Sequence, residues 1–244
     1  MSVADEISRL QQAKSDLATS IAAKGVTVPS ATTIDGYAAL VDQIQTGGSS
    51  YPFCTEIDYI ETSGTQWIDT RYYPNTNSKI RVVWMPTLIN TGGYFGSRSA
   101  DSSTTSRSRY TCTTFSSGSQ FAFAMTYNVW PSNRFTLTVN SKYDCTAENG
   151  KYSCNGTQYT SSTVSNFSTG QPFLLSRYYT GATSTGYLNA SMRIYAFQVW
   201  ENNTLIKDMI PIRIEQIGYM YDKINGGVFS NAGTGSFTLG PDVI

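Results

Sequence analysis

The sequence contains no histidine. Without an imidazole the chain cannot build a Ser-His-Asp or Cys-His nucleophile system, and it cannot hold zinc through histidine ligands. The 17 acidic residues still permit a pair of catalytic carboxylates. Carboxylate chemistry therefore remains possible for this chain.

Charged residues are also scarce. They make up 14% of the chain, below the typical quarter, and 17 basic residues balance 17 acidic ones. A neutral chain has no overall attraction to nucleic acid or to an anionic membrane, so neither is expected as a partner. No apolar run approaches the ~20 residues of a membrane helix. The opening MSVADEISRLQQ lacks the basic start and apolar stretch of a secretory signal, so we expect synthesis in the cytoplasm without one.

The chain is rich instead in small and aromatic polar residues, with 17 Tyr, 20 Gly and abundant Ser and Thr. This composition is typical of a β-rich protein whose surface presents tyrosine. Tyrosine offers a large contact area at a low cost in conformational entropy. The composition therefore favours recognition over catalysis.

No motif for phosphate binding or redox chemistry is present, because G-x-x-x-x-G-K-[ST], G-x-G-x-x-G and C-x-x-C are all absent. Four carboxylates cluster in the sequence, at Glu56, Asp58, Glu61 and Asp69. Alternation along an extended segment places Asp58 and Glu61 on opposite faces, which favours solvated strand edges over an acid pair. We expect no catalytic residue, no metal site and no cofactor.

Residues 1–46 have a helical pattern that the rest of the chain lacks. Apolar residues recur at spacings of three and four, first from Val3 to Ile21 and again from about Thr33. The pattern predicts either two small helices that pack on the main domain or a short oligomerisation and attachment segment. For the second interpretation, the contact positions are Ile7, Leu10, Leu17, Ile21, Ile34, Tyr37, Val41 and Ile44. Residues 47–53 then form a Gly/Ser linker.

From residue 54 to 244 short strand patterns alternate with turns, which predicts a β-sandwich of the jelly-roll kind. The longest strand pattern is 192–200, and Asn202-Asn203 supplies a turn before an antiparallel partner at 205–211. Residues 97–119, mostly Ser, Thr and Arg, are interpreted as a solvated loop followed by an edge strand; the alternative is a hydroxyl-rich contact loop. Predicted core positions are Trp67, Ile68, Val82, Trp84, Leu137, Val139, Ile194, Phe197 and Val199.

One hairpin can be placed by register. Asn149-Gly150 is the strongest two-residue turn signal, and centring a turn there pairs Cys145 with Cys154. Alternation outward from the turn makes this a non-hydrogen-bonded pair, whose close spacing can accommodate a disulfide. Cytoplasmic synthesis predicts two reduced thiols at first, with a later bond possible outside cells.

Five aromatic residues flank Asn, Gly, Ser or Pro rather than lying in apolar runs. Aromatic rings beside polar donors can stack on sugar rings, but they can also cap the ends of a sandwich core. Both interpretations remain open for Tyr127, Trp130, Tyr178, Tyr179 and Tyr187.

Segments at both ends of the β region resemble a known family. YIETSGTQWIDTRYYPNTNSKI (59–80) resembles the opening of a concanavalin/laminin-G-like sandwich domain found in phages and prophages of gut bacteria. The segments 192–211 and 221–243 are similar to that family's late hairpin and closing strand, and YSCNG (152–156) to its Tyr-x-x-Asn-Gly strand. The resemblance covers most of 54–244 and implies that the first and last strands are adjacent. The sequence Pro-Ile-Arg-Ile at 211–214 departs from the family's Pro-Cys-Tyr-Arg.

The segment KGVTVPSATTIDGYAALVDQI (24–44) resembles a helical motif of phage tail and fibre proteins. The two resemblances together imply a non-enzymatic virion structural protein: a tail fibre, head fibre or decoration protein that displays a receptor- or carbohydrate-binding domain. The alternative is a polysaccharide-degrading enzyme on the same scaffold. Implied partners are other virion proteins, through the N-terminal segment, and a host surface glycan.

The expected oligomer is a homotrimer, although the heptad pattern alone does not decide this. In the first helix Ile7 and Ile21 take position a and Leu10 and Leu17 take d, which favours two strands. Tyr37 at a d position fits a wider core. Phage fibres of the resembled kind are mostly trimers, and this implies three copies held through residues 1–46.

Overall fold

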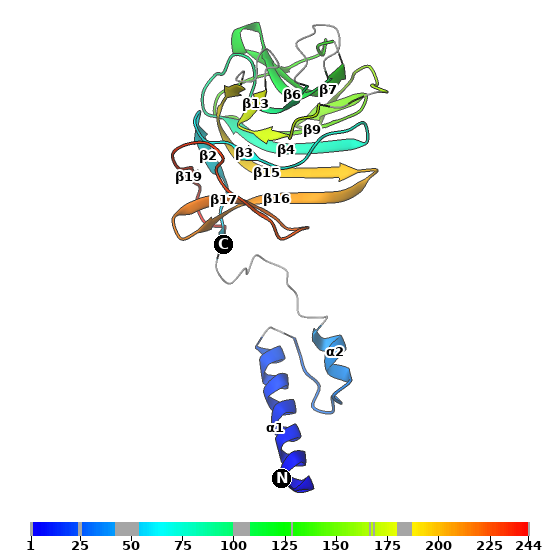
Figure 1. The fold of residues 1–244 in the computed structure, drawn as a ribbon. Helices are drawn as coiled ribbons and strands as arrows, with labels where there is room; N and C mark the ends of the chain where they lie inside the picture. The colour runs from blue at the N-terminus through cyan, green and yellow to red at the C-terminus, as the bar shows by residue number, and fades with distance from the viewer. Residues whose placement is uncertain are drawn as a thin grey trace. The chain divides into compact units, whose positions relative to one another are not determined.

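The computed structural model describes residues 2–23, 26–41, 54–99, 108–127, 129–165, 167, 169–179 and 187–243. The chain separates into two compact units, Met1–Pro52 and Phe53–Ile244 (Figure 1). The predicted linker 47–53 and the predicted contact residue Ile44 lie outside the described residues. Within the described part of the chain, no helix has the length and apolar character needed to cross a membrane.

The first unit is built around the helix α1 (Val3–Ala22). Ser2 caps it: the Ser2 hydroxyl accepts from the Asp5 amide, and the Asp5 carboxylate accepts from the Ser2 amide at 2.7 Å. The second helix, α2 (Gly36–Val41), begins a few residues after its sequence pattern, and the end of that pattern lies outside the described residues. A groove of 740 Å³ runs along α1 beside residues 26–30.

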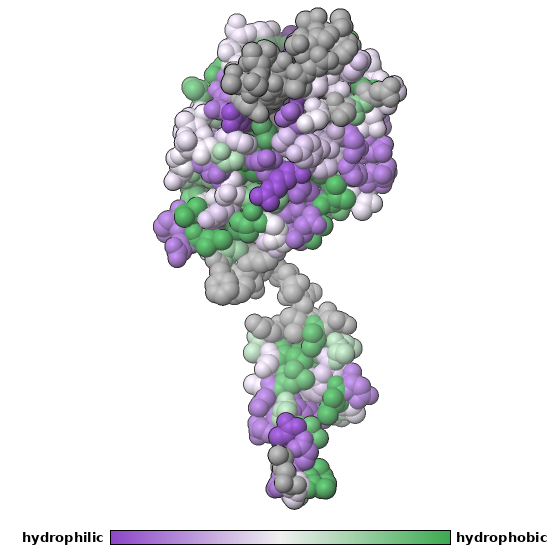
Figure 2. Space-filling model, in the orientation of Figure 1, coloured by the Kyte–Doolittle hydropathy of each residue, from purple (hydrophilic) through white to green (hydrophobic). Residues whose placement is uncertain are grey.

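This unit has a small core of its own, formed by Ile21, Val26, Tyr37 and Leu40. Two of the predicted oligomer contacts, Ile21 and Tyr37, are therefore buried within one chain. The other predicted contacts that the structure describes are exposed, with exposed fractions of 51% for Ile7, 45% for Leu10, 42% for Leu17, 65% for Ile34 and 48% for Val41. Figure 2 shows apolar side chains on the surface of this unit.

The second unit is a mainly antiparallel β-sandwich, and together with the helix before it this confirms the predicted fold class. In its described residues the large sheet runs β11 (Thr157–Thr160), β10 (Lys151–Cys154), β9 (Tyr143–Glu148), β4 (Ser78–Pro86), β15 (Ser191–Glu201), β16 (Thr204–Ile214), β17 (Ile217–Asp222) and β18 (Val228–Phe229). β1 (Thr55–Glu56) pairs with β16, while β2 (Ile60–Ser63) pairs with β15 and with β19 (Thr238–Leu239). The β2–β19 pairing confirms that the first and last strand segments are neighbours.

The small sheet runs β3 (Ile68–Asp69), β12 (Leu174–Leu175), β5 (Phe95–Arg98), β6 (Ser108–Phe115), β7 (Gln120–Tyr127) and β8 (Phe135–Thr136). A short 3-10 turn, Ser116–Gly118, joins β6 to β7. A separate hairpin of β13 (Arg177–Tyr179) and β14 (Tyr187–Asn189) has its first strand against β5.

Two hairpins follow the turn chemistry of the sequence. Asn202 and Asn203 adopt φ of 48° and 65° between β15 and β16, a left-handed conformation that asparagine tolerates well. Gly150, at φ 82°, turns β9 into β10, and the register then places Cys145 opposite Cys154. Both cysteines are free thiols.

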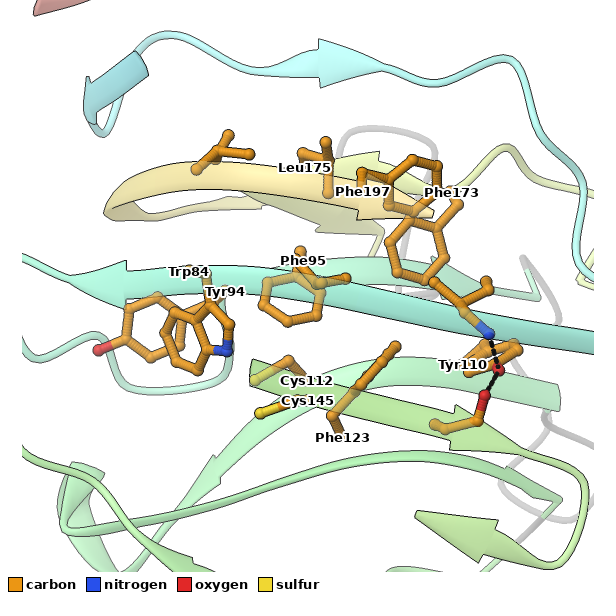
Figure 3. Close-up of a cluster of buried hydrophobic side chains, with 14 of the residues drawn as sticks. Trp84, Tyr94, Phe95, Tyr110, Cys112, Phe123, Cys145, Phe173, Leu175 and Phe197 are labelled. Atoms are coloured by element: carbon orange, nitrogen blue, oxygen red, sulfur yellow. Dashed lines mark hydrogen bonds between the residues drawn. The ribbon is translucent and has the colours of Figure 1, made fainter. Parts of the chain in front are cut away.

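Aromatic side chains from both sheets fill the space between them (Figure 3). The centre of the Trp84 ring, on the large sheet, lies 4.6 Å from the centre of the Tyr94 ring and 5.3 Å from that of the Phe95 ring. Offset and edge-on rings at such distances are mutually attractive. Tyr110 reaches from β6 across the core, where its hydroxyl accepts the amide of Ile80 and donates to the carbonyl of Ala147.

Two sequence expectations were wrong in this unit. The strand within 97–119 is not an edge strand, because β6 pairs with both β5 and β7 and is buried on both faces. Its outer face carries Thr111 and Thr113, whose side chains are small enough for this face of β6 to be buried as well. Trp67 and Val139, both predicted core residues, are only half-buried. The remaining predicted core residues are buried: Ile68, Val82, Trp84, Leu137, Ile194, Phe197 and Val199.

Candidate ligand-binding face

Four side chains on the small-sheet layer contact one another in a row, and we call them the aromatic–arginine cluster: Arg109, Trp130, Phe115 and Arg134. The guanidinium carbon of Arg109 lies 4.3 Å from the centre of the Trp130 ring. The Trp130 and Phe115 rings meet edge to face at 5.8 Å. The guanidinium carbon of Arg134 lies 3.9 Å from the centre of the Phe115 ring. Each contact is within the range of an attractive cation–π or aromatic pair.

Strand alternation explains how the cluster is assembled. Along β6, Tyr110 and Cys112 point into the core, so Arg109 and Phe115 fall on the opposite face. Between them on this face, Thr111 and Thr113 pair with Ala124 and Ala122 of β7, and these small side chains leave space beside Arg109 and Phe115. The segment after β7 then brings Trp130 and Arg134 to the same place before β8 begins.

Burial divides the cluster into a support and a contact surface. Arg109 is only 4% exposed, whereas Trp130 is 45% exposed. Phe115 is half-buried and packs against the main core, which fixes the position of the Trp130 edge. Trp130 is thus a rigid ring, held by Arg109 and Phe115, that still offers surface to a ligand.

A hollow of 220 Å³ is lined in part by Val129, the residue that precedes Trp130 in the sequence. It is lined by Tyr127, Val129 and residues 162–165, which contribute two Ser, a Thr and a Val. Tyr127 and Val129 are 39% and 53% exposed. An exposed ring beside hydroxyl groups is the combination that stacks on and hydrogen-bonds to a sugar.

The other three predicted aromatics lie on the β13–β14 hairpin. Tyr179 pairs with Tyr187 in the backbone register, and Tyr178 pairs with Leu188. Because β13 packs against β5, the backbone of all five predicted residues belongs to the small-sheet layer. Of the five, Tyr127 and Trp130 are the ones whose side chains the structure describes.

The alternative interpretation, in which these rings cap the core, has one element of support. Trp130 contacts Phe115, and Phe115 packs against the core, so Trp130 does cover part of that ring. Its exposed fraction of 45% nevertheless leaves a large part of the indole free for another contact.

The sequence analysis missed Arg109, Phe115 and Arg134. Treating 97–119 as a solvated loop concealed the alternation of Arg109, Thr111, Thr113 and Phe115 against Tyr110 and Cys112. That period of two was the signal that could have revealed Arg109 and Phe115, whereas Arg134 lies outside β6 and no such pattern marks it.

A row of charged and polar side chains on the large sheet is joined by ion pairs and hydrogen bonds. Arg81 donates to Asp144 at 2.6 Å and to Gln198 at 2.7 Å. Gln198 donates in turn to Asp208 at 2.9 Å, and Lys223 approaches the same carboxylate at 2.9 Å. This ladder crosses from β9 to β16 and stabilises the sheet, so it is a poor candidate for a ligand site.

The carboxylates that cluster in the sequence do not form an acid pair among the described contacts. Glu61 accepts from Arg193 at 2.5 Å, and Asp69 accepts from the Arg71 amide at 2.8 Å. In the described part of the chain, no group of three or more acidic, Cys or His residues could hold a metal ion.

The predicted cysteine pair faces the core rather than a site. Burial, followed by the neighbouring Cys154, raises the pKa of the Cys145 thiol well above its ordinary value. A buried thiol that resists ionisation is a poor nucleophile. Cys145 and Cys154 therefore contribute to the packing of the core.

Neither a protein-family model nor a curated protein sequence matches this chain.

Proposed function

We propose that the chain is a non-enzymatic bacteriophage virion protein, a tail fibre, head fibre or decoration protein, whose sandwich binds a carbohydrate or glycan receptor. The half-exposed Trp130 ring, held between Arg109 and Phe115, carries the proposal. The resemblance of residues 24–44 and 59–80 to phage tail and sandwich segments supports the virion assignment.

Display on a virion requires an attachment and assembly segment, and we assign this role to the first unit. Ile7, Leu10 and Leu17 form an exposed apolar stripe on α1 at spacings of three and seven. An exposed stripe of this kind is typical of a helix that packs against copies of itself. The proposed assembly is a homotrimer that also contacts other virion proteins through residues 1–46.

Glycan binding can be tested with the full chain on a panel of bacterial surface polysaccharides. We expect binding without release of reducing ends. Trp130→Ala should abolish binding, because a stacked aromatic ring contributes a large part of the contact with a sugar. Release of reducing ends would instead indicate the alternative function, a polysaccharide-degrading enzyme.

A matched control is available on the large sheet. Trp200 is also half-buried, and the ammonium group of Lys79 lies 5.2 Å from the centre of its ring. Trp200→Ala therefore removes a similar side chain with a similar cation contact. If both variants lost binding equally, the loss would reflect damage to the fold and the site assignment would be wrong.

Assembly can be tested by light scattering on the full chain, where we expect three times the mass of one chain. The variant Leu10→Glu/Leu17→Glu places two charges on the stripe and should dissociate the oligomer. Ser8→Glu/Thr19→Glu adds the same charge elsewhere on α1 and should not. A monomeric wild type, or an oligomer that survives the first variant, would contradict the role of α1.

A further inference from the structure

We propose that the aromatic–arginine cluster takes an anionic glycan, one that carries carboxylate, sulfate or phosphate groups. The proposal rests on the proposed glycan-binding function and names the chemical class of the ligand. It depends on the distribution of charge along the chain, on the hydrogen-bonding character of the cluster, and on the position of one arginine.

Charge is unevenly distributed in a chain whose net charge is zero. Residues 82–200 contain eight basic and three acidic residues, so the excess of negative charge lies elsewhere in the sequence. Two of those acids, Asp144 and Glu148, are on β9 of the large sheet and contact Arg81 and Lys151. The third, Asp101, lies outside the described residues.

On the strands of the small sheet, within the described residues, Asp69 is the one acidic side chain. It lies on the edge strand β3, whereas the cluster lies beside β6 and β7, on the other side of β12 and β5. Arg98 and Arg109 are register partners on β5 and β6. Two basic residues and no acidic residue therefore lie on the described parts of these two neighbouring strands.

The cluster offers hydrogen-bond donors and lacks strong acceptors. A guanidinium group has five N–H donors and no acceptor, and neither Trp nor Phe supplies an acceptor. A neutral sugar presents hydroxyl groups that both donate and accept, and it is best matched by a site with carboxylates. A ligand rich in acceptor oxygens matches this cluster better, and carboxylate, sulfate and phosphate groups are of that kind.

Arg134 is the member that can meet such a group. It is half-buried, it rests on the Phe115 ring, and no carboxylate of the described chain forms a salt bridge with it. A planar guanidinium held in place over a ring can make a bidentate contact with a carboxylate or a phosphate. The anionic group would contact Arg134 while the sugar ring stacks on Trp130.

The experiment uses the full chain and two pairs of polysaccharides that share a backbone. The first pair is polygalacturonate and its fully methyl-esterified form; the second is dextran sulfate and dextran. We expect at least about tenfold tighter retention of each anionic form in affinity electrophoresis, since hydrogen bonds to charged groups are the strong ones. Retention should weaken as salt rises from ~0.05 to ~0.5 M, because salt screens charge pairs that are not buried.

Variants locate the effect. Arg134→Gln should weaken retention of the anionic forms about tenfold, the expected effect of losing one charge-assisted contact, and should thereby reduce the difference in retention between each anionic form and its neutral counterpart. Lys79→Gln removes a cation from a similar ring contact on the large sheet. It should change the retention of neither the anionic nor the neutral forms. Equal thermal unfolding of the variants and wild type would show that the fold is intact.

The outcomes separate the two proposals. Equal retention of charged and neutral forms would overturn the anionic preference and leave glycan binding standing. Retention of none of the four would count against both, whereas retention of the neutral forms alone would overturn only this inference. Single-stranded DNA retained as tightly as dextran sulfate would indicate a general polyanion surface and would also overturn it.

Discussion

Replacing Tyr110 by Phe removes one oxygen atom from the middle of the sandwich. That oxygen accepts the Ile80 amide at 3.1 Å and donates to the Ala147 carbonyl. Ile80 and Ala147 are register partners on β4 and β9, so a hydroxyl from the small sheet completes a backbone contact of the large sheet (Figure 3). Burial raises the pKa of Tyr110 well above its ordinary value, and the hydroxyl therefore stays protonated and can do both.

The cost of Tyr110→Phe follows from the groups that it leaves behind. The Phe ring keeps the packing, but one backbone donor and one acceptor lose their buried partner. Each unsatisfied buried group costs ~1–3 kcal/mol, so for the two groups we expect the free energy of unfolding to fall by ~2–6 kcal/mol. For a domain of this size that corresponds to a melting temperature lower by ~4–24 °C.

Urea unfolding of the full chain, followed by tryptophan fluorescence, measures the loss. Tyr94→Phe is the matched control, because Tyr94 is equally buried but its hydroxyl donates to the carbonyl of Leu88, in a part-buried contact at 2.8 Å. Water can replace a partner there, so the control should lose less than Tyr110→Phe. A Tyr110→Phe variant within ~0.5 kcal/mol of the wild type would refute the reasoning, since that is the range of a neutral surface change.

Three further predictions concern single residues. Burial raises the pKa of both the Cys54 and Cys145 thiols, and Cys145 is the more buried, so iodoacetamide at pH 8 should label Cys54 first and Cys145 only on unfolding, as mass spectrometry would show. Gly96→Ala places a Cβ against the backbone oxygen of Tyr110 on β6 and should cost ~3 kcal/mol or more in urea unfolding, whereas Gly156→Ala, at φ 83° in open space, should cost ~1–2 kcal/mol. Burial raises the pKa of Asp222, but hydrogen bonds outweigh it and the pKa lies below 3.8. Stability should therefore be lost as pH falls from about 4 through the folded-state pKa, and Asp222→Asn should flatten this acid limb in thermal scans.

The parts of the fold that could be predicted depend on local rules. Strand alternation and an asparagine turn defined the β15–β16 hairpin, because Asn202 and Asn203 tolerate a positive φ that most residues avoid. Asn149-Gly150 gave the β9–β10 register for the same reason. In both cases the information needed for pairing lies within about ten residues of the turn.

The course of β6 could not be predicted, because its burial depends on segments distant in the sequence. A run of Ser, Thr and Arg has little apolar surface, and local reasoning places it in water. In the structure β5 and β7 flank it, and its small outer side chains permit coverage. Trp67 shows the opposite error: a large apolar residue was expected in the core, yet it is half-buried, with the guanidinium carbon of Arg177 4.6 Å from its ring centre.

The short exposed stripe of α1 limits the stability of the proposed trimer. Ile21 is buried in the core of its own unit, so the exposed apolar positions run only from Val3 to Leu17. About fourteen steps of ~1.5 Å give a seam of ~21 Å, and helices this short are marginal in water without further contacts. Lys14 interrupts the seam, which weakens it again. We therefore expect a trimer that forms at the concentrations of a light-scattering experiment but dissociates on dilution, and the proposed attachment to the virion would keep several sandwiches close together. Such an arrangement can raise apparent affinity by ~10²–10⁴ without a new contact, so a shallow site centred on one tryptophan can still hold a repetitive glycan.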